Sequence, residues 1–125
     1  MLFRSNQIVA GDRFDGGAGT DTILISATGG VSIDFSAAGT TASTGFLNME
    51  AIEFNNTTVS STGTFKFDQL TSSRINLQRI TGSAGTNILE FITPFVTSGS
   101  TSIDLSAVSL VNWTSGSDQI GRAHV

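Results

Sequence analysis

A glycine-rich segment near the start of the chain, residues 15–24, limits the possible folds most strongly. From Gly16 it reads Gly-Gly-Ala-Gly-Thr-Asp-Thr-Ile-Leu and fits the nonapeptide pattern G-G-x-G-x-D-x-U-x, in which U is apolar. Glycine adopts positive φ angles easily, so the chain can curl tightly here and turn its carbonyl oxygens inward. Asp21 contributes a carboxylate, and Ile23 starts a short apolar run typical of a strand. The pattern therefore predicts a tight turn that leads directly into a buried strand.

The same segment offers oxygen atoms suited to Ca²⁺, which takes roughly six to eight oxygen ligands, often on flexible turns. It resembles the calcium-binding repeat of the RTX (repeats-in-toxin) family, whose repeats form parallel β-rolls and β-helices. The resemblance implies a metal site at Gly16, Gly17, Gly19 and Asp21. It also implies a bacterial protein, secreted or at the cell surface, that leaves the cell by a type I pathway and folds in external Ca²⁺.

A second, incomplete copy of the pattern precedes the first. Asp12 lies nine residues before Asp21, but Ala10 stands where the pattern has a glycine. We include Asp12 among the candidate metal ligands for this reason. In the β-roll that the resemblance implies, the turn sharing an ion with Asp21 would lie near residue 3 or residue 39, and neither place carries an acid. The site is therefore expected to be incomplete in this chain. The alternative role for Asp21 is to accept hydrogen bonds from backbone amides of its own turn.

Two segments of the chain recur in the same order. Gly82–Leu89 resembles Gly16–Ile23, and Ser102–Ala107 resembles Ser32–Ala37 at a slightly larger offset. Repetition of a turn followed by a strand indicates a solenoid. Because Asn87 replaces the aspartate in the second glycine-rich segment, we interpret that segment as a structural turn with weakened metal affinity.

The rest of the chain predicts short strands between turns. Apolar and polar residues alternate in Val31–Phe35 and Phe65–Phe67, which gives each strand one buried face. We expect an all-β fold, a parallel β-solenoid fragment of β-roll or β-helix type, with a β-sandwich as the alternative. One helical turn is expected at residues 68–73 with Asp68 as its cap, and Pro94 is expected to end a strand. The expected strands are Thr22–Ser26, Val31–Phe35, Ala51–Asn55, Thr57–Ser60, Thr64–Phe67, Arg74–Leu77, Ile88–Ile92, Ser102–Leu105 and Val108–Trp113.

Composition excludes several classes of function. The net charge is −4 and the six Lys and Arg residues form no cluster, which argues against binding to nucleic acid or an anionic membrane. The chain has no cysteine, so disulfides and thiolate metal sites are excluded. It has no apolar run of about 18 residues, the length that predicts a membrane span. Nine phenylalanines and a low charge content indicate a folded β protein rather than a disordered chain.

The inventory of catalytic residue types is poor. The chain has one histidine and no tyrosine, and Asp34 and Asp104 stand in alternating segments without a neighbouring acid. We therefore expect no enzyme. The leading hypothesis is a non-catalytic, calcium-binding structural module whose partners are neighbouring coils of a larger protein, with an extracellular ligand that the sequence does not identify. A metal-independent β-solenoid adhesin or spacer is the second hypothesis, and a polysaccharide-acting β-helix enzyme is the third.

We divide the chain into three parts. Residues 1–24 form the nonapeptide turn region, and residues 25–119 carry solenoid repeats with the degenerate second motif at 82–89. Residues 120–125, Ile-Gly-Arg-Ala-His-Val, resemble the translation of a common sequencing adapter and are interpreted as a non-native tail. On this interpretation His124, the only histidine, is not native, and the chain is a fragment of a longer protein.

Overall fold

The chain folds into an all-β parallel solenoid of about three turns, which confirms the expected fold class. The structure is a computed structural model that describes residues 2–3, 8–26, 31–41, 43–56, 59–93 and 103–124. All strand pairs formed by these residues are parallel. The alternative of a β-sandwich, which is built from antiparallel sheets, is therefore wrong.

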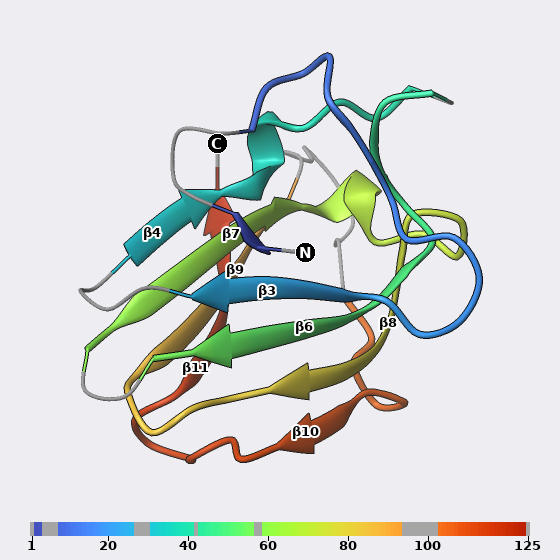
Figure 1. The fold of residues 1–125 in the computed structure, drawn as a ribbon. Helices are drawn as coiled ribbons and strands as arrows, with labels where there is room; N and C mark the ends of the chain where they lie inside the picture. The colour runs from blue at the N-terminus through green and yellow to red at the C-terminus, as the bar shows by residue number, and fades with distance from the viewer. Residues whose placement is uncertain are drawn as a thin grey trace, which may run out of the picture.

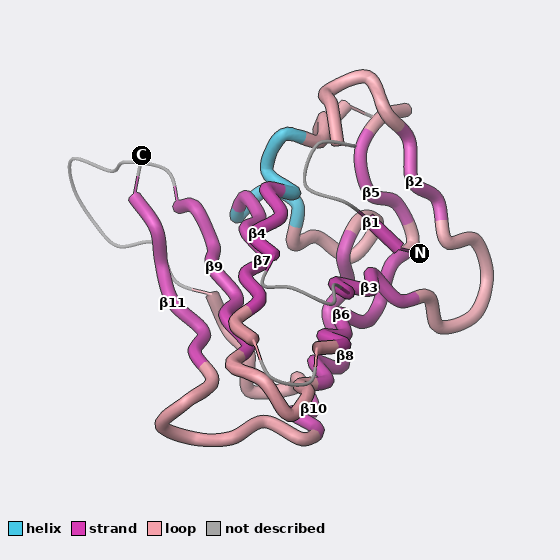
Figure 2. The backbone as a smooth tube through the Cα atoms, turned by 60° about the vertical axis from the view of Figure 1, so that its left-hand side comes forward, coloured by secondary structure: helices cyan, strands magenta, loops and turns pink. Residues whose placement is uncertain are grey.

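Successive coils contribute one strand to each of two sheets (Figure 1). The first sheet contains, in order, β1 (Leu2–Phe3), β3 (Thr22–Ser26), β6 (Met49–Asn55), β8 (Ile75–Thr81) and β10 (Ser109–Val111). The second contains, in order, β4 (Val31–Asp34), β7 (Ser61–Lys66), β9 (Asn87–Thr93) and β11 (Gln119–His124). A short third sheet pairs β2 (Arg13–Asp15) with β5 (Gly45–Leu47). Figure 2 shows β9 and β11 on one side of the molecule and β2 and β5 on the other.

The length of one coil follows from the residues that meet across neighbouring coils. Paired strand residues such as Thr22 and Ala51 lie one coil apart, and residues whose side chains bond to the neighbouring coil are separated by 29 positions in one case and by 31 in another. The glycine-rich segments that recur in the sequence occupy different corners of this coil. Gly16–Asp21 leads into β3 of the first sheet, whereas Gly82–Asn87 leads into β9 of the second. The spacing between these two segments is therefore not a whole number of coils.

Three turns of the chain contain the same kind of local hydrogen bond. The carbonyls of Phe35, Phe67 and Leu105 each accept the N–H three residues later, at 3.1, 3.1 and 3.0 Å. The first two begin the 3₁₀ turns η1 (Phe35–Ala37) and η2 (Phe67–Gln69). The similarity between Ser32–Ala37 and the described part of Ser102–Ala107 thus corresponds to equivalent turns of different coils.

A column of phenylalanine rings fills the space between the sheets. Phe35 and Phe65 stack with ring centroids 4.6 Å apart and planes 6° apart, and Phe91 continues the column 6.4 Å from Phe65. All three side chains are buried, as the alternation predicts. Phe46, from β5, joins them from the side at 5.8 Å from Phe35. Stacking of equivalent inward residues from successive coils therefore builds the core.

The expected strand at Ser102–Leu105 is wrong over its described residues, because 103–105 form no strand. Asp104 accepts the N–H of Ser106 at 2.9 Å, and this local bond favours a turn. The expected strand at Thr57–Ser60 has only residues 59–60 described, and these form no strand either. The sequence does not predict the short strands β2 and β5, because each has only three residues and shows no clear alternation of apolar and polar side chains.

The expected helical turn at 68–73 begins one residue earlier, at Phe67, and ends at Gln69. Its cap is Lys66 rather than Asp68, because the Lys66 N–H donates to Gln69 Oε1 at 2.7 Å. Pro94 lies outside the described residues, and β9 ends at Thr93.

The division of the chain into three parts stays a prediction. β3 crosses the boundary after residue 24, and residues 120–124 belong to β11, which pairs with β9. Within the part of the chain that the structure describes, no helix is long and apolar enough to cross a membrane.

Replacing Phe65 by alanine is expected to cost about 3–5 kcal/mol of unfolding free energy, because its ring contacts rings on both sides of the column. Thr62 lies on the opposite face of the same strand, so Thr62→Ala is the matched control and should stay within about 0.5 kcal/mol. Urea denaturation followed by circular dichroism measures both. Equal losses in the two variants would contradict the assignment of the column as the core.

Candidate functional site at the glycine-rich turn

The backbone of the nonapeptide turn requires each of its three glycines. Gly17 and Gly19 have φ angles of 86° and 114°, a region that side chains with a Cβ rarely enter. A Cβ on Gly16 would lie 2.5 Å from the Cβ of Asp21 and would also collide with the carbonyl oxygen of Asn48. The turn predicted from the sequence is therefore present, and its glycines are explained by conformation and packing.

The neighbouring coil that supports this turn is the segment Leu47–Glu50. Gly16 donates its N–H to the carbonyl of Leu47 at 3.0 Å, and Glu50 donates its N–H to the carbonyl of Asp21 at 3.0 Å. The expectation that the downstream partner turn lies near residue 39 is wrong. That expectation assumed a coil of two nonapeptides, whereas the real coil places residue 50 beside residue 21.

Glu50 is a site residue that the sequence analysis missed, because no motif marks it. Its Oε2 accepts the N–H of Asp21 at 2.8 Å, in a partly buried position. A side chain from the second coil thus reaches into the turn of the first. The sequence could have predicted the contact between Glu50 and Asp21 only if the coil length had been known.

The Asp21 carboxylate lies against Gly16 inside the turn. Its Oδ2 is buried and has no hydrogen-bond partner. This oxygen therefore does not accept a hydrogen bond from the backbone amides of its own turn, which was the alternative role for Asp21. A buried, unpartnered carboxylate oxygen is costly, and such atoms call for a physical explanation.

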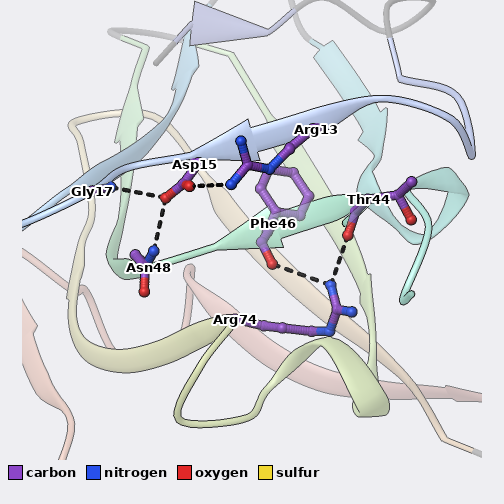
Figure 3. A network of polar contacts seen from close by, with 7 residues as sticks. All are labelled: Arg13, Asp15, Gly17, Thr44, Phe46, Asn48 and Arg74. Carbon is purple, nitrogen blue, oxygen red and sulfur yellow. Dashed lines mark hydrogen bonds and ion pairs between the residues drawn. The ribbon is translucent and has the colours of Figure 1, made fainter. Parts of the chain in front are cut away.

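Asp15 ties the turn to the next coil from outside (Figure 3). Its Oδ1 accepts the Asn48 side-chain amide at 2.7 Å and the Gly17 N–H at 3.0 Å, and its Oδ2 pairs with Arg13 at 2.6 Å. The Asn48 hydrogen bond is the largest influence on the pKa of Asp15, and together with Gly17 and Arg13 it holds that pKa below its usual value against the opposing effect of desolvation. Asp15 therefore remains ionised and engaged by protein groups.

Asp12 has a separate role at the other end of β2. Its Oδ2 accepts the N–H of Val9 at 3.1 Å, and its carbonyl accepts the N–H of Gly45 at 2.6 Å. The structure does not bring its carboxylate into contact with Asp21. Across the described ranges, no group of three or more acidic or histidine side chains is arranged to hold a metal ion.

Arg74 anchors the loop behind the site. Its guanidinium is buried and donates to the carbonyls of Thr44 at 2.9 Å and Phe46 at 3.3 Å (Figure 3). It also donates to the carbonyl of Thr41. Backbone carbonyls thus satisfy a buried cation and fix the chain that leads into β5 and Asn48.

The second glycine-rich segment forms a turn whose polar side chain is fully used by the protein. Asn87 is buried, and its side-chain amide donates to the carbonyls of Ser83 and Gly85 at 3.1 Å each and to Asp118 Oδ1 at 3.0 Å. Asn56, one coil earlier, donates to Asn87 Oδ1 at 3.4 Å. Asn56, Asn87 and Asp118 follow one another at intervals of 31 residues, a polar ladder that the sequence analysis missed although its spacing is visible.

The acids considered for catalysis are held locally. Asp34 Oδ1 accepts the N–H of Ser36 at 3.0 Å, and Asp104 Oδ1 accepts the N–H of Ser106 at 2.9 Å. Both carboxylates accept an N–H two residues later and so hold local turns, and both residues are exposed.

Comparison of the chain with family models, with curated proteins and with solved structures finds no match. The interpretation of the site therefore stands on its residues and their geometry.

Gly16→Ala is expected to destabilise the protein by about 1–3 kcal/mol, because the added methyl group meets backbone that cannot move independently. Gly11→Ala is the matched control, since a Cβ there has no heavy atom within 4 Å and the expected change is zero or a gain of up to about 1 kcal/mol. Thermal unfolding of both variants measures the difference. A Gly16 variant as stable as the Gly11 variant would show that this close approach does not exist.

The pKa of Asp15 is expected to lie below 3.8 in the folded protein and to rise when Asn48 is replaced by glycine. Glycine is the suitable substitution because Asn48 has a φ angle of 53°. A folded-state pKa below the unfolded value means that ionised Asp15 favours the native state at neutral pH and that this contribution disappears as the pH falls through the folded pKa. An NMR titration of the Asp15 carboxyl carbon measures the shift, and an unchanged pKa in the variant would contradict the assigned cause.

Proposed function

We propose that this chain is a non-catalytic structural module in which Ca²⁺ bound at the glycine-rich turn stabilises the solenoid. The observation that supports this proposal is the buried Asp21 Oδ2, which has no hydrogen-bond partner. A buried polar atom left unsatisfied costs about 1–3 kcal/mol, and more when it is charged. A bound cation would remove this cost, whereas the turn alone does not.

The residues around Asp21 fit a hard cation. The carboxylates of Asp21 and Glu50 belong to adjacent coils, and Glu50 already contacts the Asp21 backbone at 2.8 Å. Together with carbonyl oxygens of the turn residues Gly16, Gly17 and Gly19, they would supply anionic and neutral oxygens on irregular backbone, which suits Ca²⁺ better than Mg²⁺. The ion would neutralise the two carboxylates and link the first coil to the second. Asp12 would not take part, since its carboxylate holds the Val9 N–H.

Metal binding of this kind would couple to folding. An ion that binds only the folded state adds its binding free energy to stability. The resemblance to calcium-binding repeats supports a bacterial protein that is secreted or at the cell surface, because Ca²⁺ is available outside the cell. It also supports neighbouring coils of a longer protein as the partners. The absence of enzymatic activity stays a prediction.

A metal-independent solenoid spacer or adhesin segment is the second candidate. It is favoured by the fact that packing and φ angles alone account for Gly16, Gly17 and Gly19. Asp15 and Asn48 also join the two coils without an ion. This candidate predicts a stability that is the same in chelator and in Ca²⁺.

At about 10 mM Ca²⁺, the expected gain in unfolding free energy is about 1.4 kcal/mol for a dissociation constant near 1 mM, a value typical of extracellular modules. For a domain of this size, that gain corresponds to a rise in melting temperature of about 3–8 °C. Thermal unfolding in Ca²⁺, in Mg²⁺ and in chelator measures the effect.

Asp21→Asn should abolish the Ca²⁺ response, and Glu50→Gln should weaken it. Asp12→Asn is the matched control, because it removes an acid from the same region of sequence but not from the proposed site. A wild-type protein that does not respond to Ca²⁺ would favour the second candidate. A response that survives Asp21→Asn and disappears in Asp12→Asn would place the ion elsewhere.

A further inference from the structure

We infer that a pocket between two consecutive coils, beside an irregular part of β8, binds a small organic cation, namely a primary amine with an apolar body. One wall of the pocket comes from residues 67–77 and the other from residues 103–108 of the next coil. Its volume is about 280 Å³, just below the roughly 300–1,000 Å³ typical of ligand pockets, so the ligand is a small molecule. This inference does not depend on calcium binding.

A bulge in β8 opens the space for this pocket. Between its pairs at Ile75 and Arg79, β8 has three residues where β6 has only one. The additional residues leave the regular ladder, and the described pairs between β8 and β10 begin at Arg79, past the bulge. Asn76 and Leu77 of the bulge line the pocket. Bulges are frequent beside binding sites because they redirect side chains.

The side chain that bridges the earlier coils at this corner has no equivalent between the later ones. Gln69, the third residue of η2, is 0% exposed and donates its side-chain amide to the carbonyl of Phe35 in η1 at 2.8 Å. The turn that begins at Leu105 has Ala107 at the same position, and alanine has no polar atom to reach the carbonyl of Phe67. The corner between these two coils therefore lacks this kind of bridge, in agreement with the pocket at this place.

The lining of the pocket combines apolar side chains with a single negative charge. Seven of the eleven described lining residues are apolar, and Thr71, Ser72 and Asn76 are polar but neutral. Asp104 is the one charged residue among them. The apolar lining disfavours a hydrated metal ion, and the carboxylate disfavours an anion. An ammonium group attached to a hydrocarbon body suits both parts of the lining.

Asp104 is held in place by its own turn. It is exposed, and its Oδ1 accepts the N–H of Ser106 at 2.9 Å. The hydrogen bond with the Ser106 side chain, and then the one from its N–H, lower the pKa of Asp104 against the opposing effect of desolvation. The carboxylate is therefore ionised at neutral pH. Asp34 holds the turn of an earlier coil in the same way, at 3.0 Å from the Ser36 N–H, but it does not line the pocket and so provides a matched control.

An NMR titration of the isotope-labelled chain with phenethylamine, in the presence of chelator, tests the proposal. We expect saturable shifts of the backbone amides of Asn76, Leu77 and Asp104 at millimolar ligand. Phenethyl alcohol, which has the same apolar body without the charge, should bind about 2–5-fold more weakly, as expected for the loss of an exposed ion pair. The anion hydrocinnamate should bind more weakly still. The absence of saturable shifts at these amides, or equal affinities for the amine and the alcohol, would overturn the proposal.

Two variants separate the charge of Asp104 from the shape of the pocket. Asp104→Asn should weaken phenethylamine binding about 2–5-fold and leave the affinity for phenethyl alcohol unchanged. Asp34→Asn should leave both affinities unchanged, although it removes the same charge from the protein. If Asp104→Asn lost both ligands, Asp104 would maintain the turn rather than attract the cation, and the proposal would fail. It would also fail if Asp34→Asn weakened amine binding as much as Asp104→Asn did.

A third ligand distinguishes a free amine from a lysine side chain of a partner protein. Lysine that is capped at both ends carries the same ammonium group on a peptide backbone. We expect capped lysine to bind more weakly than phenethylamine, because the small pocket does not accommodate the backbone. Tighter binding of capped lysine would overturn the assignment to a small molecule.

Discussion

The parallel pairing of successive coils is the constraint on which the other features of this molecule depend. Paired residues of parallel strands face the same side, so every inward residue stacks on its counterpart one coil away. This stacking places Phe35 on Phe65 at 4.6 Å and Asn56 beside Asn87 at 3.4 Å. A slip of one residue would turn the apolar row to solvent and bury the polar one. The same register brings Glu50 to Asp21, so the core and the candidate site are consequences of one set of backbone hydrogen bonds.

The sequence predicts several individual strands but not the way in which the strands form coils. Thr22–Ser26 matches β3 at both ends, because a glycine-rich turn and an apolar run define it. The coil length was not recoverable from the similarity between residues 16–23 and 82–89, since these segments lie at different corners. The turn-forming potential of glycine is local and therefore recurs wherever the chain bends. The 31-residue interval between Asn56, Asn87 and Asp118 carried better information on the coil, because a buried ladder requires polar residues at the same corner of each coil.

The sequence predicts only one of the two segments that form the candidate site. The pattern of Gly16, Gly17, Gly19 and Asp21 identifies a turn from local rules, and the structure contains that turn. The surface against which the turn packs comes from Leu47–Glu50, which is distant in sequence and has no glycine motif of its own. Asp12 matched the nonapeptide spacing but serves its own turn at the opposite end of β2. The nine-residue spacing alone cannot tell which acid belongs to the site, because it does not specify which coils lie side by side.

The glycines and the acid of the nonapeptide pattern meet different physical requirements. Gly16 leaves room for Asp21, and Gly17 and Gly19 supply positive φ angles, with or without an ion. The backbone of Asp21 pairs with the next coil in a way that any residue type allows. Its Oδ2 is buried without a partner, and a neutral side chain would avoid the cost of burying an unpaired charge. At Asn87 the corresponding side chain is neutral, and its amide is bonded within its own turn and to Asp118. The carboxylate is thus the one element of the pattern that packing does not explain, and the case for calcium depends on it rather than on the glycines.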